Sequence, residues 1–216
     1  MKKFFSYDPK LLLYGFLIVF FASYGQTFFI SLFNTEIRFY YGLSDGEFGL
    51  VYAISTLFSS FILISFAKLI DHIDLRVYSL IVTGGLLLAS IGMVLQLNNI
   101  FYLFIIIFML RFFGQGAMSH AGETSMARYF GNNRGKALSI ATLGGMAGVM
   151  FLPYIVLNYF DNIEMKQLWL YVSISIVVFI PFIFLALSDQ KVRHNKFNDD
   201  LINDPLNLKL RTRDII

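Results

Sequence analysis

The residues that could do chemistry lie in one apolar stretch, which reads IFYLFIIIFMLRFFGQGAMSHAGETSMARYF from residue 100 to residue 130. This stretch is long enough to cross a bilayer and carries Arg111 in its middle. Steps of four residues from the arginine reach Gln115, Ser119 and Glu123, and on a helix these four would form one polar stripe. A charge at the bilayer centre costs about 2.5–3.5 kcal/mol on insertion scales. The stripe should therefore face protein or a water-filled cavity, which favours a polar pathway through a membrane.

The composition is that of an integral membrane protein. The 216 residues are 57% hydrophobic and 14% charged, against roughly 45–50% and 25% in soluble domains, and the mean hydropathy is +0.67. The chain has no cysteine, which excludes disulfides, thiolate nucleophiles and cysteine metal sites. The basic residues flank apolar segments, so the net charge of +3 indicates membrane lipid as a partner and no nucleic acid.

Six segments meet the length of about 20 residues that a spanning helix needs, which predicts an all-α membrane protein. The helices are expected at 11–33, 47–70, 77–97, 100–127, 137–160 and 167–187, within a transmembrane bundle of residues 1–187. Residues 188–216 are charged and rich in asparagine, as in a tail or a linker between bundles. Ser44 and Glu47 have the spacing of a capping box at the start of the second helix.

The placement of lysine and arginine predicts the orientation. Of these 17 residues, 14 would lie on the side of the two termini, Arg38 and Lys166 would lie on the other side, and Arg111 would lie within the membrane. Because cytoplasmic loops carry the excess of basic residues, both termini are predicted to be cytoplasmic. We expect a multi-pass protein of the plasma membrane, most simply a bacterial inner membrane.

An internal repeat relates the two halves of the bundle. Gly25-Gln26 in the first helix recurs 89 positions later as Gly114-Gln115 in the fourth helix, and the same spacing maps YYG at 40–42 onto YFG at 129–131. Three helices separate the copies, so the copies have opposite orientations in the membrane. Two inverted three-helix repeats are typical of secondary transporters.

Two motifs resemble those of the major facilitator superfamily, specifically of its N-terminal six-helix half. The connection AKLIDHIDLR at 67–76 resembles the family's loop pattern G-x-L-x-D-R-x-G-R-R, in which Asp71 and Arg76 match and Asp74 replaces a glycine. RFFGQG at 111–116 resembles the family's arginine-and-glycine motif in the fourth helix. Within the family, the chain is most similar to carriers of the monocarboxylate or oxalate–formate type.

The resemblance implies a carrier, not an enzyme, that needs no cofactor and moves a small solute, with a proton or a counter-solute, by rocking two six-helix bundles. The candidate substrate-binding or coupling residues are Arg111, Gln115, Gln26, Ser119, Glu123 and Thr27. Asp71, Asp74 and Arg76 would form a cytoplasmic gating motif. The second half would come from a longer chain or from a second copy, and the sequence at 213–216 reads like the start of a seventh helix.

Several of these residues have a purely structural alternative. Arg111 could join helices by donating to backbone carbonyls and side-chain amides, whereas an unpaired guanidinium in a cavity would attract a carboxylate. Serines and threonines such as Thr27 commonly hydrogen-bond between membrane helices. Glu123 is expected to pair with Arg128, with Arg134 or with the loop motif at 67–76, and a proton relay is the alternative.

Other patterns are best explained by packing. His120 and Glu123 have a metal-compatible spacing, but one pair cannot close a site, so no metal is expected. Gly144 and Gly148 form a G-x-x-x-G face for close helix packing. The alternatives to a twelve-helix carrier are a half-size homodimeric carrier and a non-transporting six-helix protein, such as an assembly factor or an intramembrane enzyme.

Overall fold

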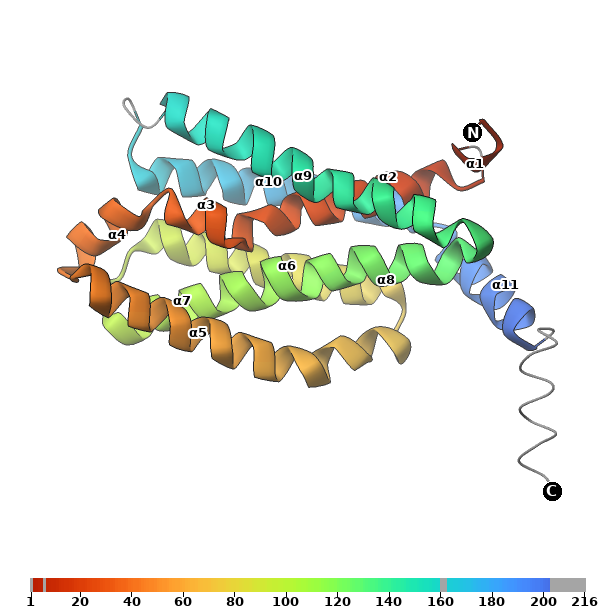
Figure 1. Cartoon of the computed structure of the whole chain (residues 1–216), viewed down its shortest axis with the longest axis horizontal. Coiled ribbons are helices and arrows are strands. Elements are labelled where there is room, and N and C mark those ends of the chain that lie inside the picture. Colours follow the sequence, from red (N-terminus) through yellow and green to blue (C-terminus); the bar gives the residue numbers. More distant parts are fainter. Residues whose placement is uncertain (1, 6, 160–162, 203–216) are drawn as a thin grey trace, which may run out of the picture.

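The computed structural model describes residues 2–5, 7–159 and 163–202, which form an all-α bundle of long helices lying side by side (Figure 1). Within these described residues, six helical stretches are long and apolar enough to cross a membrane, which confirms the predicted fold class. These six spans are Pro9–Ser31, Asp45–Asp71, Leu75–Leu95, Ile100–Tyr129, Gly131–Asn158 and Met165–Ala186.

The first and fourth spans are interrupted helices. In chain order the elements are α1 (Lys2–Phe5), α2 (Pro9–Ala22), the 3-10 turn η1 (Ser23–Gly25), α3 (Thr27–Ser31), α4 (Asn34–Tyr41), α5 (Asp45–Phe66), the 3-10 turn η2 (Ala67–Asp71), α6 (Leu75–Leu95), α7 (Ile100–Met109), the π-helix η3 (Leu110–Met118), α8 (Ser119–Tyr129), the 3-10 turn η4 (Gly131–Asn133), α9 (Arg134–Tyr159), α10 (Met165–Ala186) and α11 (Gln190–Ile202). Helix α11 lies in the segment read as a tail or linker. The seventh-helix start read at 213–216 lies outside the described residues.

Polar side chains cap the N-termini of several helices. At α5, the Ser44 hydroxyl accepts from the backbone N–H of Glu47, and the Glu47 carboxylate accepts from the backbone N–H of Ser44 at 2.8 Å, which confirms the predicted capping box. The side chains that cap α2, α6 and α7 in the same way are Asp8, Asp74 and Asn99. One or two of the free N–H groups at each of these helix starts are thereby satisfied.

Helix α2 lies at the centre of the bundle and packs against α8, α9, α10 and η3. Its contact with α9 is close because glycine faces it. A Cβ at Gly144 would lie 1.9 Å from the backbone oxygen of Phe16, and a Cβ at Gly148 would lie 2.0 Å from the hydroxyl of Ser23. Small residues matter here because the hydrophobic effect does not drive helices together in lipid.

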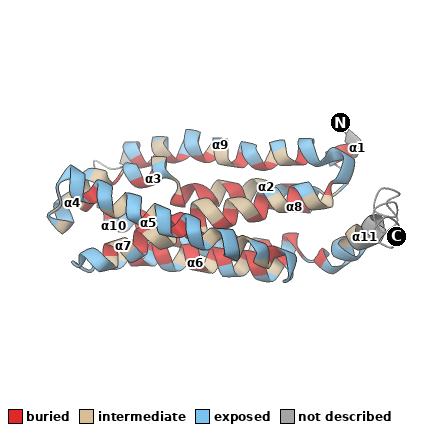
Figure 2. Cartoon of the chain, turned by 60° about the horizontal axis from the view of Figure 1, so that its bottom comes forward, coloured by how far each residue is buried: buried red, intermediate tan, exposed pale blue. Residues whose placement is uncertain are grey.

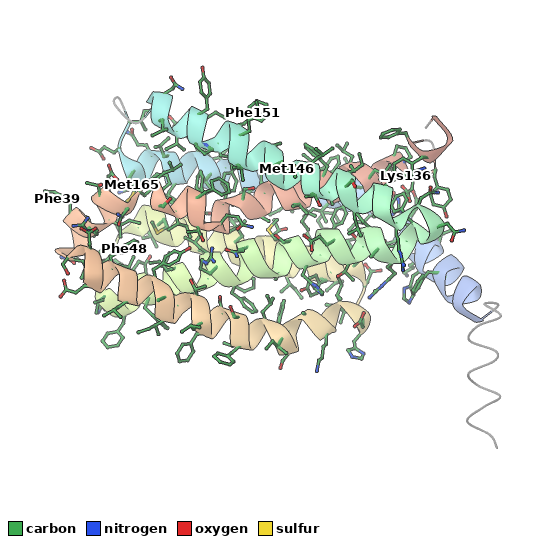
Figure 3. The ribbon with its side chains drawn as sticks, in the orientation of Figure 1. Phe39, Phe48, Lys136, Met146, Phe151 and Met165 are labelled. Atoms are coloured by element: carbon green, nitrogen blue, oxygen red, sulfur yellow. The ribbon has the colours of Figure 1, made fainter. Side chains whose placement is uncertain are left out.

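Two spans are much less enclosed than the others. Only 11% of the most apolar window of the second span is buried, and 28% of that of the fifth span, against 56% for the first and third spans. Figure 2 shows long exposed strips on α5 and α9, and exposed Met146 and Phe151 follow one another along α9 in Figure 3. These exposed apolar faces could contact lipid or another protein.

Candidate functional site

The first span breaks at the position of the repeated Gly-Gln pair. Helix α2 passes into the 3-10 turn η1, and Gln26 is extended, with φ −77° and ψ 153°, before α3 begins. A Cβ at Gly25 would lie 2.1 Å from the backbone oxygen of Leu110 and 2.8 Å from the Cα of Gly114, so only glycine fits at this crossing. The two copies of the repeated glycine therefore touch. Broken helices at membrane depth persist where protein or a cavity surrounds them.

Arg111 fills the break. Its Nη1 donates to the backbone oxygen of Gly25 and to the hydroxyl of Thr27, both at 3.1 Å, and its Nε donates to the hydroxyl of Thr56 at 3.2 Å. The guanidinium carbon lies 5.3 Å from the ring centroid of Tyr52, and the Tyr52 hydroxyl donates to Thr27 at 2.9 Å. We call Gly25, Thr27, Tyr52, Thr56 and Arg111 the Arg111 cluster.

Every hydrogen-bond acceptor in the Arg111 cluster is neutral. Arg111 is 6% exposed and forms no ion pair with the described residues. Its Nη2 makes no hydrogen bond within the described part of the chain. The cluster thus holds a permanent positive charge, because arginine does not deprotonate in proteins, and keeps one nitrogen of the fork available.

The π-helix η3 divides the predicted polar stripe. A π-helix closes its hydrogen bonds five residues apart, so steps of four residues no longer stay on one face between 110 and 118. Arg111 joins the cluster above, whereas Ser119 and Glu123 line a separate cavity. Gln115 belongs to neither group, and its Oε1 is buried without a partner in the described residues. π-Helical turns frequently occur at functional sites.

The cavity lies between the first, fourth and fifth spans, has a volume of about 400 Å³ and opens to the outside of the bundle. We call it the Glu123 cavity; its lining residues are Val19, Gln26, Ser119, Glu123, Thr142, Gly145, Met146, Val149 and Met150. It brings together three of the predicted site residues, Gln26, Ser119 and Glu123. Among its lining residues only Glu123 can carry a charge.

Glu123 does not pair with Arg128 as the sequence suggested. Arg128 instead donates to the Asp71 carboxylate and, at 3.2 Å, to the backbone oxygen of Ile70. Glu123 is exposed to the cavity and forms neither an ion pair nor a hydrogen bond with the described residues. His120 points along its own helix, where its Nδ1 lies 3.3 Å from the Thr124 hydroxyl. No group of three acidic or histidine side chains that could hold a metal is found in the described residues.

The predicted gating residues lie at the end of the bundle that carries α11 (Figure 1), here called the basic end because Lys10, Arg76, Arg128 and Arg193 make contacts there. Asp71 pairs with Arg128. Asp74 accepts from the backbone N–H of Arg76 at 2.8 Å and begins α6. Arg76 donates to the backbone oxygens of Leu187 and Ser188 after α10. Each of the three therefore has a structural contact within this bundle.

Helix α11 is tied to the same end. Arg193 grips both carboxylate oxygens of Asp8, and Lys10 pairs with Asp189 at 3.3 Å. The Gln190 side chain donates to the Tyr129 hydroxyl at 2.7 Å. Asp8, Asp71 and Asp189 at the basic end thus each have a basic partner, whereas Arg111 and Glu123 form no ion pair with the described residues.

Reasoning from the sequence missed several residues of the site. Tyr52 and Thr56 lie four residues apart on the second span, so they share one face of the helix. Two polar groups on one face of an apolar helix could have identified them as candidates. The role of the Gly25 backbone oxygen could not be predicted from the sequence, because this oxygen becomes free to accept only through the break in the first span. Thr142 joins the Glu123 cavity from the fifth span.

A family model described as Major Facilitator Superfamily matches residues 15–212. No curated protein and no solved structure matches the chain. The match covers most of the sequence and includes most of the first span, the other five spans in full, the Arg111 cluster and the Glu123 cavity. The chain therefore belongs to the major facilitator superfamily of membrane transporters.

Proposed function

We propose that this chain is one half of a carrier that moves a small organic anion by alternating access, and that Arg111 attracts the anion. The observation that supports the proposal is a nearly buried guanidinium whose hydrogen-bond acceptors are all neutral. A membrane arginine without a counter-ion is costly and is a functional-site hypothesis by default. The likeness to monocarboxylate and oxalate–formate carriers supplies the candidates, which are small mono- and dicarboxylates.

The contacts of Arg111 also define how an anion would bind. Nη1 uses both of its N–H groups, on Gly25 and Thr27, and Nε uses its one N–H on Thr56. A carboxylate can bind Nη2 without disturbing these contacts. A two-point grip through Nη2 and Nε would displace Thr56, so anion binding and the contact with the second span compete for the same N–H.

The alternative is that Arg111 is only a clamp across the broken helix. Arg111→Lys keeps the charge and loses the planar fork, and Arg111→Gln removes the charge. We expect both variants of the complete carrier to insert into the membrane and to lose transport of the acid. One charge-assisted contact of about 1.5–3 kcal/mol corresponds to an apparent affinity weakened about tenfold to a hundredfold.

The experiment measures uptake of labelled lactate and oxalate into reconstituted vesicles, alongside the amount of inserted protein. The control is Thr56→Val, which removes an acceptor of the clamp and leaves the charge in place. Full uptake by well-inserted Arg111→Gln would reject the anion site. Loss of inserted protein in both arginine variants, with normal transport per inserted molecule, would favour the clamp.

The exposed faces of α5 and α9 are proposed to meet the second six-helix half, from a longer chain or from a second copy. Both termini are proposed to be cytoplasmic, since 14 of the 17 lysines and arginines are predicted to lie on the side of the termini. The chain has no cysteine, so Asn98→Cys and Asn133→Cys, both at exposed positions, are clean reporters. We expect an impermeant thiol reagent to label Asn98→Cys on intact cells and Asn133→Cys only after lysis. The reverse pattern would overturn the orientation.

A further inference from the structure

The Thr27 hydroxyl is a point in the Arg111 cluster where two donors meet. Arg111 Nη1 donates to its oxygen at 3.1 Å, and the Tyr52 hydroxyl donates to the same oxygen at 2.9 Å. A hydroxyl group has two acceptor lone pairs and one hydrogen to donate. Both lone pairs of the Thr27 oxygen are therefore occupied, so its O–H group is left to act as a donor.

The Thr27 O–H group has no acceptor among the described residues. Both hydrogen bonds that the hydroxyl makes there are bonds that it accepts. Thr27 begins α3 just after the break at Gln26 and is exposed, whereas Arg111 is nearly buried. Nη2 of Arg111 also lacks an acceptor in the described part of the chain. The Arg111 cluster thus offers a solute two kinds of donor, a charged N–H and a neutral O–H.

We propose that Tyr52 is a positioning residue that makes the Arg111 cluster select carboxylates over their amides, because it keeps the Thr27 hydroxyl in the donor role. The inference rests on the proposed function and deepens it by assigning how the site distinguishes solutes. A carboxylate has only acceptors, so it can take both Nη2 and the Thr27 O–H. An amide of the same shape replaces one oxygen by NH2, whose two donors find no lone pair on Thr27. A site rejects a solute that leaves its polar groups unpaired.

Tyr52 is held in place by Arg111 itself. The centroid of its ring lies 5.3 Å from the guanidinium carbon, which is a cation–π distance. One helical turn further along α5, the Thr56 hydroxyl accepts from Arg111 Nε at 3.2 Å. The ring and the next turn of α5 therefore both lie against the guanidinium, and the Tyr52 hydroxyl reaches Thr27 from this fixed position.

The Thr27 O–H group also offers the anion a second contact that leaves the Thr56 contact intact. A grip through Nη2 and Nε would displace Thr56, whereas Nη2 and the Thr27 O–H have no described partner to displace. Tyr52→Phe keeps the ring against Arg111 and removes only the O–H that Thr27 accepts. One lone pair of the Thr27 oxygen then becomes free, so this oxygen can accept from the N–H of an amide.

The test compares acids with their amides in vesicles that hold the complete carrier. The probes are lactate with lactamide and oxalate with oxamate, and each is measured by its inhibition constant against uptake of labelled lactate or oxalate. In Tyr52→Phe the amide-to-acid ratio of these constants should fall about threefold to tenfold, which is the range for one neutral hydrogen bond. The maximum rate per inserted molecule should stay within about twofold. Arg111 is unchanged in this variant, so the attraction by its charge cancels in the comparison.

The matched control is Tyr102→Phe, which removes another tyrosine hydroxyl that joins two helices. The Tyr102 hydroxyl donates to the backbone oxygen of Gly92 on α6 at 2.8 Å and is not part of the Arg111 cluster, so its loss should leave the ratio unchanged. Thr27→Val should lower the ratio by itself, because it removes the O–H donor. In that background Tyr52→Phe should lower the ratio no further, since a residue that acts through Thr27 then has nothing left to position.

Inhibition constants do not depend on the amount of inserted protein, so weak insertion of a variant does not affect the ratio. An unchanged ratio in Tyr52→Phe would overturn the proposal, and so would a further fall in the Thr27→Val background or an equal fall in Tyr102→Phe. An unchanged ratio in Thr27→Val would overturn it whatever the result for Tyr52→Phe. Failure of the proposed function gives a different result, namely no movement of any small carboxylate by the unmodified protein, and it would overturn both proposals.

Discussion

Arginine has opposite surroundings at the basic end of the bundle and in the Arg111 cluster. At the basic end, Arg128 and Arg193 pair with carboxylates. In the Arg111 cluster, the guanidinium meets only a carbonyl, two hydroxyls and an aromatic ring. The difference separates arginines whose charge is matched within the bundle from Arg111, whose charge is not, and the proposed role of Arg111 rests on this difference.

The largest expected effect breaks a matched pair. The Arg193 and Asp8 side chains are only 10% and 18% exposed, so Asp8→Ala would leave a nearly buried cation and remove the cap of α2. We expect a loss of about 3 kcal/mol in the free energy of unfolding from the broken pair, with up to about 1 kcal/mol more from the cap. Thermal unfolding in detergent measures it. Asp8→Asn keeps the capping acceptor and should recover only the second part, and an unchanged melting temperature in Asp8→Ala would contradict the matched-pair account.

A smaller effect is expected in the Arg111 cluster. Thr56→Val removes the acceptor of Arg111 Nε and leaves that N–H unsatisfied, which costs about 1–3 kcal/mol. The same change removes the protein's competitor for the anion, so apparent affinity for the acid should hold or improve while stability falls. Thr56→Ser keeps the hydroxyl and serves as the control. A drop in affinity that matches the drop in stability would mean that Arg111 acts on the fold alone.

The smallest effect is expected at an exposed pair. Lys10 and Asp189 are 58% and 59% exposed, and solvent screens such pairs. The hydrogen bond from Lys10 and then its charge lower the pKa of Asp189. The small stabilisation is therefore present above the unfolded-state pKa and is lost as the pH falls through the folded-state value. Asp189→Asn should lower the melting temperature slightly at neutral pH and not at all in acid. A difference that persists in acid would show that the pair does not act through its charge.

The sequence predicted the long periodic elements well and the irregular ones poorly. Six apolar runs and the capping box at Ser44 follow from local chemistry, and the structure has both. The break at Gln26 and the π-helix η3 do not follow from local chemistry. They occur where Gly25 and Gly114, which belong to different spans, come into contact. The predicted stripe was divided for this reason. A four-residue spacing predicts one face only while the helix stays regular.

The ion-pair partners of charged residues were hard to predict, because the partners come from distant parts of the sequence. Glu123 and Arg128 are close in sequence, yet Arg128 pairs with Asp71, which is 57 positions away. Lone acids and bases in a membrane span could be recognised as candidates from the sequence alone. Which of them stay unmatched is decided by the packing of several helices, and this is the information that the structure adds.

The contact between Gly25 and Gly114 also limits how this protein can change over time. A methyl group at either position would meet the backbone of the other span, at 2.8 Å from Gly114 Cα or 2.7 Å from Gly25 Cα. A backbone cannot rotate out of the way as a side chain can. Any path of single substitutions away from glycine at one of these positions therefore passes through a less stable protein. The two glycines occupy matching places in the two repeats, and each one restricts which residues the other position can accept.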